Sequence, residues 1–329
     1  MNKHRKNVWT KFWQESRADS CAQYIQSHDS EIDIFWNDVS KQLSAKEVVV
    51  DLCTGQGAVI QALITNYEKT SNENTAPIFH GIDAATIING QASDLLSKYP
   101  DNIRFYFSSP IENLPLADQS VNSMVSQFGF EYALSRELYV EINRVLLSGG
   151  SLYAVMHNVD SILTKNAIFE VEQISYLHND LSIFNTVNEL AKYFAMANNP
   201  ANIQKLKNSE EANRLRSEFN QKITSLNVLI DNNTYNDIYI NARSVVTEAL
   251  KRAQLDSIRA AKTLLKDYIK ELEYAKFRAE ELIECALSKK EVNNLIKNLG
   301  EQLEISDYDI QVLKSKSEIV AWGLRIKKA

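Results

Sequence analysis

The sequence contains little cysteine: three residues in 329, Cys21, Cys53 and Cys285, and no two of them have C-x-x-C spacing. Disulfide frameworks and zinc sites need cysteines in sets with defined spacing, so the sequence argues against both, and we predict no metal site. Sparse, unpaired cysteine is also typical of a reducing compartment. We therefore expect a cytoplasmic protein.

Long hydrophobic runs and a strong positive charge are also lacking. No apolar run approaches the roughly 20 residues of a membrane helix. The basic N-terminus, residues 1–6, is not followed by the apolar core of a secretory signal. The formal net charge is -6, with no concentrated lysine and arginine stripe. We therefore expect neither a membrane nor a nucleic acid as partner.

Glycine and proline are scarce, and their distribution divides the chain. Seven of the nine glycines lie between Gly55 and Gly150, and four of the five prolines lie between Pro77 and Pro115. From residue 151 to residue 299 there is no glycine and a single proline, Pro200. The pattern predicts a turn-rich α/β region followed by a stretch that is nearly all helix.

Hydrophobic periodicity in the first half alternates between the strand period and the helix period. Such alternation predicts a parallel sheet with helices on both faces. The predicted strands are Val48–Leu52, Ile78–Ile82, Ile103–Phe107, Val121–Gln127 and Ser151–His157. The predicted helices are Trp9–Gln23, Ile32–Leu43, Ala58–Tyr67, Ile87–Lys98 and Ser135–Leu147.

The C-terminal residues return to a strand pattern. A short helix, Lys290–Leu299, precedes two strand-like runs, Glu304–Leu313 and Glu318–Lys327, with a polar break between them. Two runs joined by a short turn form a hairpin, whose strands are antiparallel. One of the two strands must then oppose the parallel sheet if both join it.

The helical stretch holds one strong heptad repeat. Apolar residues recur every seven positions at Ile258, Leu265, Leu272, Ala279 and Ala286. Such a narrow seam packs against another helix. Two interpretations stay open: packing inside the chain against a helix such as 212–229, or a seam between two copies of the chain.

The segment from Val48 to Ala58 predicts a ligand site. A β-branched run ends at Asp51, and a small-residue turn with Gly55 and Gly57 leads into a helix. A strand, a tight loop and a helix N-terminus form a place to hold a nucleotide-like ligand. Position 60 is Ile60, where a dinucleotide fingerprint has its third glycine, so a dehydrogenase is disfavoured. The alternative is an ordinary strand–helix turn.

A second acid, Asp83, ends the next predicted strand. An acid at this place can accept hydrogen bonds from two ribose hydroxyls. The alternative interpretation is a helix N-cap.

Taken together, these motifs resemble those of class I S-adenosylmethionine (SAM)-dependent methyltransferases, specifically the type 11 group. The resemblance covers residues 45–160 and resumes at 290–329. It rests on residues 51–57, on Gly81-Ile82-Asp83, on residues 112–121, and on residues 143–152 with Gly149-Gly150. It implies an α/β, Rossmann-like seven-stranded methyltransferase sheet, parallel with one antiparallel strand in the hairpin Asp309–Lys327, and a large all-helical insertion after strand five.

The resemblance also implies SAM as the cofactor and a set of residues that bind it. Asp51 would organise the loop under the methionine amino group, Gly55 and Gly57 would let the backbone approach, and Asp83 would bind the ribose. Cys53 stands where glycine is commonest. Pro110 stands where family members often have an acid that contacts adenine, so backbone groups near Ile111 would serve instead. The full implied set is Asp51, Cys53, Thr54, Gly55, Gly57, Asp83, Ala84, Ile111, Glu112 and Gln127.

Candidates for acceptor contacts follow the fourth and fifth strands, because ligands lie at the carboxyl ends of parallel strands. We predict Glu131 and His157 as catalytic proton acceptors. The alternatives are a capping or solvated acid and a hydrogen-bonded loop histidine. The predicted substrate pocket comprises Phe128, Phe130, Tyr132, Trp9 and Trp13.

The aromatic residues Trp9, Phe12 and Trp13 have helical spacing. They form either a packed core face or an aromatic lid over the cofactor. In the second case, Arg17 and Tyr24 would reach the methionine carboxylate.

The predicted organisation has four parts. Residues 1–44 form N-terminal helices that serve as a possible cofactor lid, and residues 45–159 form the SAM-binding core. Residues 160–289 form a helical insert, either a substrate lid or a homodimer arm, and residues 290–329 complete the sheet. We predict a methyltransferase acting on oxygen or nitrogen of a small-molecule or peptide-like acceptor. The alternatives are a protein or RNA methyltransferase and a non-catalytic SAM-binding assembly module.

Overall fold

A computed structural model describes residues 3–15, 30–71, 76–233 and 235–329. The strands are β1 (Val48–Leu52), β2 (Ile78–Asp83), β3 (Ile103–Phe107), β4 (Val121–Gln127), β5 (Leu146–Met156), β6 (Ile305–Ser315) and β7 (Glu318–Lys328). The helices of the α/β part are α1 (Lys3–Glu15), α2 (Glu31–Ser40), α3 (Ala58–Thr70), α4 (Gln91–Lys98), η1 (Phe130–Ala133), α5 (Arg136–Val145) and α12 (Lys289–Gly300). The other helices are α6 (Ile162–Ser175), η2 (Tyr176–Asp180), α7 (Ile183–Ala197), η3 (Pro200–Asn202), α8 (Ile203–Lys207), α9 (Glu210–Asn232), α10 (Asp237–Leu255) and α11 (Ile258–Cys285).

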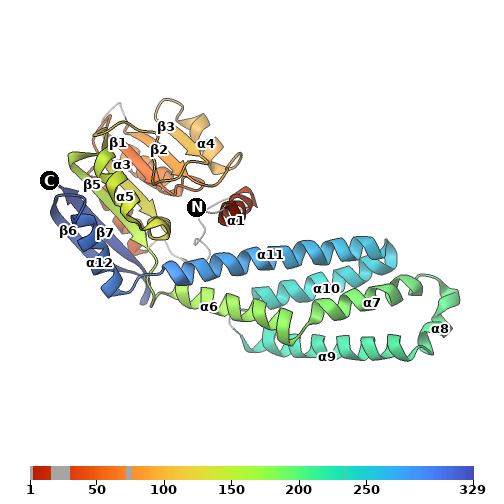
Figure 1. Ribbon diagram of the computed structural model, residues 1–329. Coiled ribbons are helices and arrows are strands. Elements are labelled where there is room, and N and C mark those ends of the chain that lie inside the picture. Colours follow the sequence, from red (N-terminus) through yellow and green to blue (C-terminus); the bar gives the residue numbers. More distant parts are fainter. Residues whose placement is uncertain (1–2, 16–29, 72–75, 234) are drawn as a thin grey trace. The chain divides into compact units, whose positions relative to one another are not determined.

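The seven strands form one sheet in the order β3-β2-β1-β4-β5-β7-β6 (Figure 1). Strands β1 to β5 pair in parallel, whereas β7 pairs antiparallel with both β5 and β6. The predicted sheet, with one antiparallel strand and a helical insertion after the fifth strand, is confirmed. The carboxyl ends of β1 and β2 are neighbours because Asp51 is in register with Gly81.

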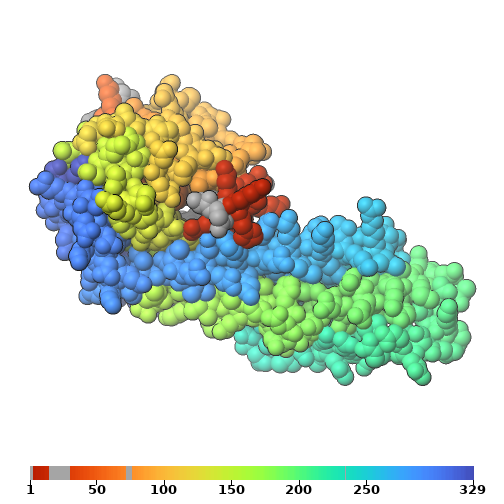
Figure 2. Space-filling view, in the orientation of Figure 1, coloured from red at the N-terminus to blue at the C-terminus, as the bar shows by residue number. Residues whose placement is uncertain are grey.

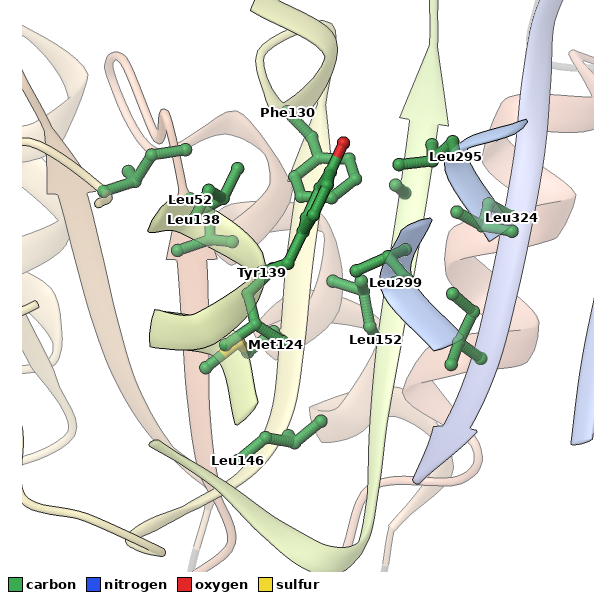
Figure 3. Packing of buried hydrophobic residues seen from close by; sticks show 14 of the residues in the cluster. Leu52, Met124, Phe130, Leu138, Tyr139, Leu146, Leu152, Leu295, Leu299 and Leu324 are labelled. Atoms are coloured by element: carbon green, nitrogen blue, oxygen red, sulfur yellow. The ribbon is translucent and has the colours of Figure 1, made fainter. Parts of the chain in front are cut away.

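Both faces of the sheet are covered by helices. Alternate strand residues point to opposite faces, and apolar side chains on each face have to be buried. On one face, Val50 and Leu152 pack with the apolar sides of α5 and α12, as Figure 3 shows for part of this cluster. On the other face, Val49 and Val155 pack with α2 and α3. Burial on both faces explains why β1 opens with three consecutive valines, residues 48–50.

The insertion after β5 leaves and rejoins the sheet domain at one point. Asn158 forms a parallel bridge with Leu287, and the Leu287 N–H donates to the His157 carbonyl at 2.9 Å. The Trp322 indole N–H, from β7, donates to the Leu287 carbonyl at 2.7 Å. The two ends of the insertion are therefore tied together by backbone hydrogen bonds.

The chain divides into two compact units: residues 1–165 with 281–329, and residues 166–280. The second unit is entirely helical in the part that the structure describes and has its own apolar core. The heptad residues Leu265 and Leu272 are buried in this core together with Leu215 and Leu226 of α9. The interpretation of the seam as packing within the chain is thus supported.

Several predicted element bounds need correction. Helix α4 begins at Gln91, not at Ile87, because Gly90 before it has φ of 107°. Strand β5 begins at Leu146, so the Gly149-Gly150 pair lies inside the strand, where its register against β4 shifts. The first helix, predicted as Trp9–Gln23, begins at Lys3, and residues 16–23 lie outside the described residues.

In the described part of the chain, every helix is too short or too polar to cross a membrane.

Candidate functional site

The loop between β1 and α3 has a tightly constrained backbone. Cys53, Gly55 and Gly57 all have positive φ, at 58°, 51° and 81°. The Thr54 hydroxyl donates to the Asp51 carboxylate at 2.6 Å, and the Gly57 N–H donates to the Thr54 carbonyl at 2.8 Å. The loop therefore folds back on the acid that ends β1.

Asp83 connects this loop to the end of β2. Its carboxylate accepts the Gly55 N–H at 2.9 Å and the Ala85 N–H at 2.7 Å. The glycine-bearing turn and the second strand are held together by this one side chain. Asp83 ends β2 as predicted, Asp51 is the last residue but one of β1, and the two strands are neighbours in the sheet.

A cavity of about 140 Å³ opens beside these two acids. Its described lining is mostly apolar and aromatic, with three carboxylates and one arginine. The lining residues are Arg5, Trp9, Trp13, Asp51, Cys53, Thr54, Gln56, Ala58, Val59, Asp83, Ala84, Ile111, Glu112, Gln127, Phe128, Gly129, Tyr132 and Ala133. Apolar walls with a few placed polar groups are typical of small-molecule sites.

Burial changes the protonation behaviour of the two acids. It raises the pKa of Asp51 to about 7, against the hydrogen bond from Thr54, and nearby Asp83 raises it further. Burial also raises the pKa of Asp83, although backbone hydrogen bonds from Ala85 and Gly55 oppose the shift. A cation bound beside them would restore their ionised forms.

The structure brings most of the predicted cofactor residues together. Eight of the ten line the cavity, whereas Gly55 and Gly57 are not among its described lining residues. The two glycines shape the loop instead. A Cβ on Gly55 would overlap the Trp13 indole, and one on Gly57 would approach Leu95 and Phe105 within 3 Å.

The turn after β4 supplies another wall. Gln127 accepts a hydrogen bond from the Trp36 indole, and Phe128 has φ of 54° with its N–H donating to the Val155 carbonyl at 2.8 Å. Of the predicted pocket residues on this turn, Phe128 and Tyr132 line the cavity. Phe130 is fully buried and points into the sheet core instead (Figure 3).

Glu131 and His157 lie together in the interior. The Glu131 carboxylate accepts the backbone N–H of His157 at 2.7 Å and is 4.0 Å from its Nε2 atom. The His157 ring stacks on Phe128, with ring centres 4.5 Å apart. Burial raises the pKa of Glu131 to about 7 and lowers that of His157 to about 3. Neither is among the described residues that line the cavity.

Helix α1 closes one side of the cavity. Trp9 and Trp13 line it from this helix, and Arg5 does so one turn earlier than Trp9. Figure 2 shows the red atoms of α1 at the surface beside the orange-yellow part of the chain. The other two residues that the lid interpretation named, Arg17 and Tyr24, lie outside the described residues.

Sequence reasoning missed Arg5, Gln56 and Glu281. The Gln56 amide donates to the Trp13 carbonyl at 2.9 Å and to the Asn89 carbonyl at 3.0 Å, so it ties α1 to the loop before α4. Its place between two motif glycines was a usable signal. No local pattern marks Arg5 or Glu281, because their contact joins residues 276 positions apart.

Among the described residues, no three histidine, cysteine, aspartate or glutamate side chains are grouped in a way that would hold a metal ion. Cys53 and Cys285 are free thiols.

Comparisons with known proteins give matches to solved structures alone: no family model and no curated protein matches the chain. A candidate SAM-dependent methyltransferase from Methanococcus maripaludis matches with a TM-score of 0.44 and 13% identity, over 100% of this chain and 97% of that one. Geranyl diphosphate C-methyltransferase from Streptomyces coelicolor, solved with S-adenosyl-L-homocysteine (SAH), matches with a TM-score of 0.36 and 12% identity, over 47% and 65% of the two chains.

A SAM-dependent methyltransferase from Aquifex aeolicus gives a TM-score of 0.34 and 18% identity, over 46% of this chain and 73% of that one. The chain spans less than two thirds of the length of two geranyl diphosphate methyltransferases that it matches, 44% of one and 65% of the other.

Proposed function

We propose that this protein is a SAM-dependent methyltransferase that methylates oxygen or nitrogen of a small-molecule or peptide-like acceptor. One observation carries the proposal: Asp51 and Asp83 end adjacent parallel strands, and both line a single cavity beside the glycine-bearing loop. These groups fit a ligand with an ammonium group and a ribose. The sequence motifs led to the same pair of residues.

Each part of the cavity suits one part of the cofactor. Asp51 would bind the ammonium group, and Asp83 would accept hydrogen bonds from the ribose hydroxyls. Helix α3 begins beside the cavity, and its N-cap, Gly57, offers no side-chain acceptor to the helix N–H groups. These N–H groups suit a carboxylate. Ile111 and Glu112 line the remaining part, where the adenine would lie.

SAM supplies a methyl group that is already activated by its bond to a sulfonium. The residues of the chain then have to hold the acceptor in line with that methyl group and exclude water. Trp9, Phe128 and Tyr132 provide an apolar, aromatic wall for this purpose.

The lining of the cavity favours a small-molecule acceptor over RNA. Arg5 is the single cation in the described lining, and its Nε atom is 2.7 Å from the Glu281 carboxylate. A site for a nucleic acid backbone needs several cations. An acceptor with an apolar or aromatic body matches this surface better.

We keep Glu131 and His157 as candidate general bases for a substrate that carries a proton, with His157 the weaker base because burial lowers its pKa to about 3. The raised pKa of Glu131, about 7, suits a general base at neutral pH. Because both side chains are buried behind the cavity wall, their action requires the turn at 127–132 to open toward the acceptor.

The first test is calorimetry of the purified protein with SAM, SAH and NAD in parallel. Binding of the two sulfur ligands in the micromolar range, without NAD binding, supports the proposal. Binding of NAD alone, or of none of the three, contradicts it.

Variants separate an enzyme from a non-catalytic SAM-binding module. Asp83→Ala should weaken SAM binding in either case, since the ribose contact is lost. Glu131→Gln and His157→Asn should reduce methyl transfer only in an enzyme, measured with a labelled methyl donor and a panel of hydroxyl and amine acceptors. A wild-type protein that binds SAM but labels no acceptor, protein or RNA supports the assembly module instead.

Two further proposals concern assembly and location. The helical insert offers a surface for a homodimer, which sedimentation of the full chain at several concentrations tests. We also propose a cytoplasmic location, which the sparse cysteine content supports and cell fractionation tests.

A further inference from the structure

The Glu281 carboxylate contacts two residues of α1 at once. One oxygen is 2.7 Å from the Arg5 Nε atom, and the other accepts the Trp9 indole N–H at 2.9 Å. The side chains of Arg5 and Glu281 are only 22% and 14% exposed. Charge-assisted hydrogen bonds in such a partly buried place are short and poorly screened by salt.

The same two α1 residues contact Tyr132, a lining residue of the cavity that belongs to η1. The Arg5 guanidinium is 5.5 Å from the centre of the Tyr132 ring, and the Trp9 ring meets it edge to face at 5.9 Å. All three side chains line the cavity. Glu281 is not a lining residue itself, yet it fixes the direction in which Arg5 and Trp9 point.

The cavity is bounded on one side by α1, which supplies Arg5, Trp9 and Trp13 to its lining. The exchange of a ligand bound there is limited by the wall that opens most readily. The walls formed by Asp51, Asp83 and Gln127 belong to strands of the sheet, which the backbone ladder holds in place.

Helix α1 is the wall that can move. Besides those with Glu281, the polar contacts of α1 include the Thr10 hydroxyl with the Thr86 N–H, at 3.0 Å, and the Trp13 carbonyl with Gln56. Neither of these belongs to a ladder of backbone hydrogen bonds. Contacts of this kind open at a lower free-energy cost than a strand in a sheet.

We infer that Glu281 is a positioning residue, which holds α1 closed over the pocket and thereby sets how long a ligand stays bound. The identity of the ligand rests on the proposed function, but the attachment of α1 to Glu281 does not. Glu281 acts through Arg5 and Trp9, without touching the ligand.

The chain offers a matched control for testing this inference. Glu280 precedes Glu281 on α11, its side chain is 48% exposed, and its carboxylate lies 3.8 Å from Lys276. Glu280→Gln therefore removes a charge at almost the same place without affecting α1. Glu281→Ala removes both contacts, whereas Glu281→Gln keeps an oxygen for Trp9 and loses the ion pair with Arg5.

The first readout needs no ligand. Two of the four tryptophans lie on α1, and the other two, Trp36 and Trp322, are only 3% and 7% exposed. Acrylamide quenching of the fluorescence therefore reports chiefly on Trp9 and Trp13. We expect about twofold stronger quenching for Glu281→Ala, a smaller increase for Glu281→Gln, and no change for Glu280→Gln.

The second readout is the dissociation rate of SAH, measured by stopped-flow fluorescence. Loss of a closing contact should act mainly on this rate, and we expect an increase of about tenfold or more for Glu281→Ala. Glu280→Gln should match the wild type. Equal quenching and equal dissociation rates for the Glu281→Ala and Glu280→Gln variants would overturn the inference.

Failure of the proposed function would be recognised separately. If the wild type binds no SAH but Glu281→Ala still increases quenching, the role of Glu281 stands and the cofactor assignment fails. Circular dichroism and thermal unfolding check the fold of each variant. If Glu281→Ala does not fold, the comparison of Glu281→Gln with Glu280→Gln decides.

Discussion

The side chain of Cys53 fills the space beside the backbone of Gly129, with its Sγ atom 3.5 Å from the Gly129 carbonyl oxygen. A Cβ at position 129 would overlap the Cys53 Cβ. The loop after β1 and the turn after β4 therefore approach as closely as they do only because residue 129 has no side chain. Both residues line the pocket, so this contact sets the spacing of two of its walls.

We expect Gly129→Ala to destabilise the protein by about 1–3 kcal/mol through overpacking. Cys53→Gly alone should be nearly neutral, because relief of the φ of 58° offsets the added freedom of the unfolded chain. The double variant should recover most of the loss, which denaturant unfolding of all four proteins measures. Additive effects of the two substitutions would show that the contact does not limit the spacing.

Arg144 should be a major source of stability near the pocket. Its guanidinium pairs with Glu141 at 2.7 Å and with Asp118 at 2.6 Å, and donates to the Leu116 carbonyl at 2.9 Å. Arg144 thus holds the C-terminal part of residues 111–118, a segment whose first residue, Ile111, lines the cavity. We expect Arg144→Ala to cost about 2–4 kcal/mol of unfolding free energy, because Glu141 loses its partner. Chemical denaturation measures this value.

Arg136, on the same helix, is the control for that experiment. It is exposed, and its side chain makes no hydrogen bond or ion pair with the described residues. Arg136→Ala should change stability by less than about 0.5 kcal/mol. Similar losses for the two arginine variants would contradict the role given to Arg144.

Glu131 should make stability fall as pH rises. Burial raises its pKa from 4.5 to about 7, so between these values the folded protein holds a proton that the unfolded chain has released. The free energy of unfolding therefore decreases over this range and levels off above it. The lowered pKa of His157 acts in the opposite direction between about 3 and 6.5.

Comparison with Glu131→Gln isolates the Glu131 contribution, since the other groups are common to both proteins. From pH 5 to pH 8 the wild type should lose up to about 3 kcal/mol more than the variant. Thermal unfolding across this range gives the comparison. Parallel curves for the two proteins would mean that Glu131 is ionised throughout.

Ligand affinity should depend on the protonation of Asp51. Its pKa is about 7 in the free protein, so under the proposed function binding of the SAH ammonium group would displace a proton. Affinity should therefore rise about tenfold from pH 6 to pH 8. Calorimetry in buffers of different ionisation enthalpy measures the released proton directly.

Asp51→Asn should bind SAH more weakly and with little dependence on pH. The exposed turn residue Asp101 supplies the control, because Asp101→Asn leaves the pocket unchanged. An Asp51→Asn variant that keeps the wild-type pH dependence would assign the titration to another group.

The sheet could be predicted from the sequence because its signals are local. Val48–Leu52 opens with three valines, carries the acid Asp51 as its last residue but one, and has the same bounds in the structure. Chain order predicted an acid at the end of each of the first two strands, and the structure makes these strands neighbours. The antiparallel seventh strand followed from the short polar turn between Leu313 and Glu318.

The walls of the pocket were harder to predict, because they depend on contacts between distant residues. Phe130 and Phe128 are both aromatic residues on one turn, yet one enters the core and the other faces the cavity. The positive φ of Phe128 turns its side chain away from that of Phe130, and no sequence pattern predicts this backbone conformation. The contact of Glu281 with Arg5 is likewise a product of the fold.

The hydrogen bonds that join His157 and Val159 to Leu287 make the insertion a closed side loop of the sheet domain. The free-energy cost of closing a loop grows only slowly with its length, so a long helical unit adds little to the cost of pairing β5 with β7. The helical unit is therefore attached to the sheet domain at a single place, where residues 157–159 pair with Leu287. A shorter or longer unit attached there would leave the strand order unchanged. Changes in length between residues 159 and 287 should therefore leave the pairing of β5 with β7 intact.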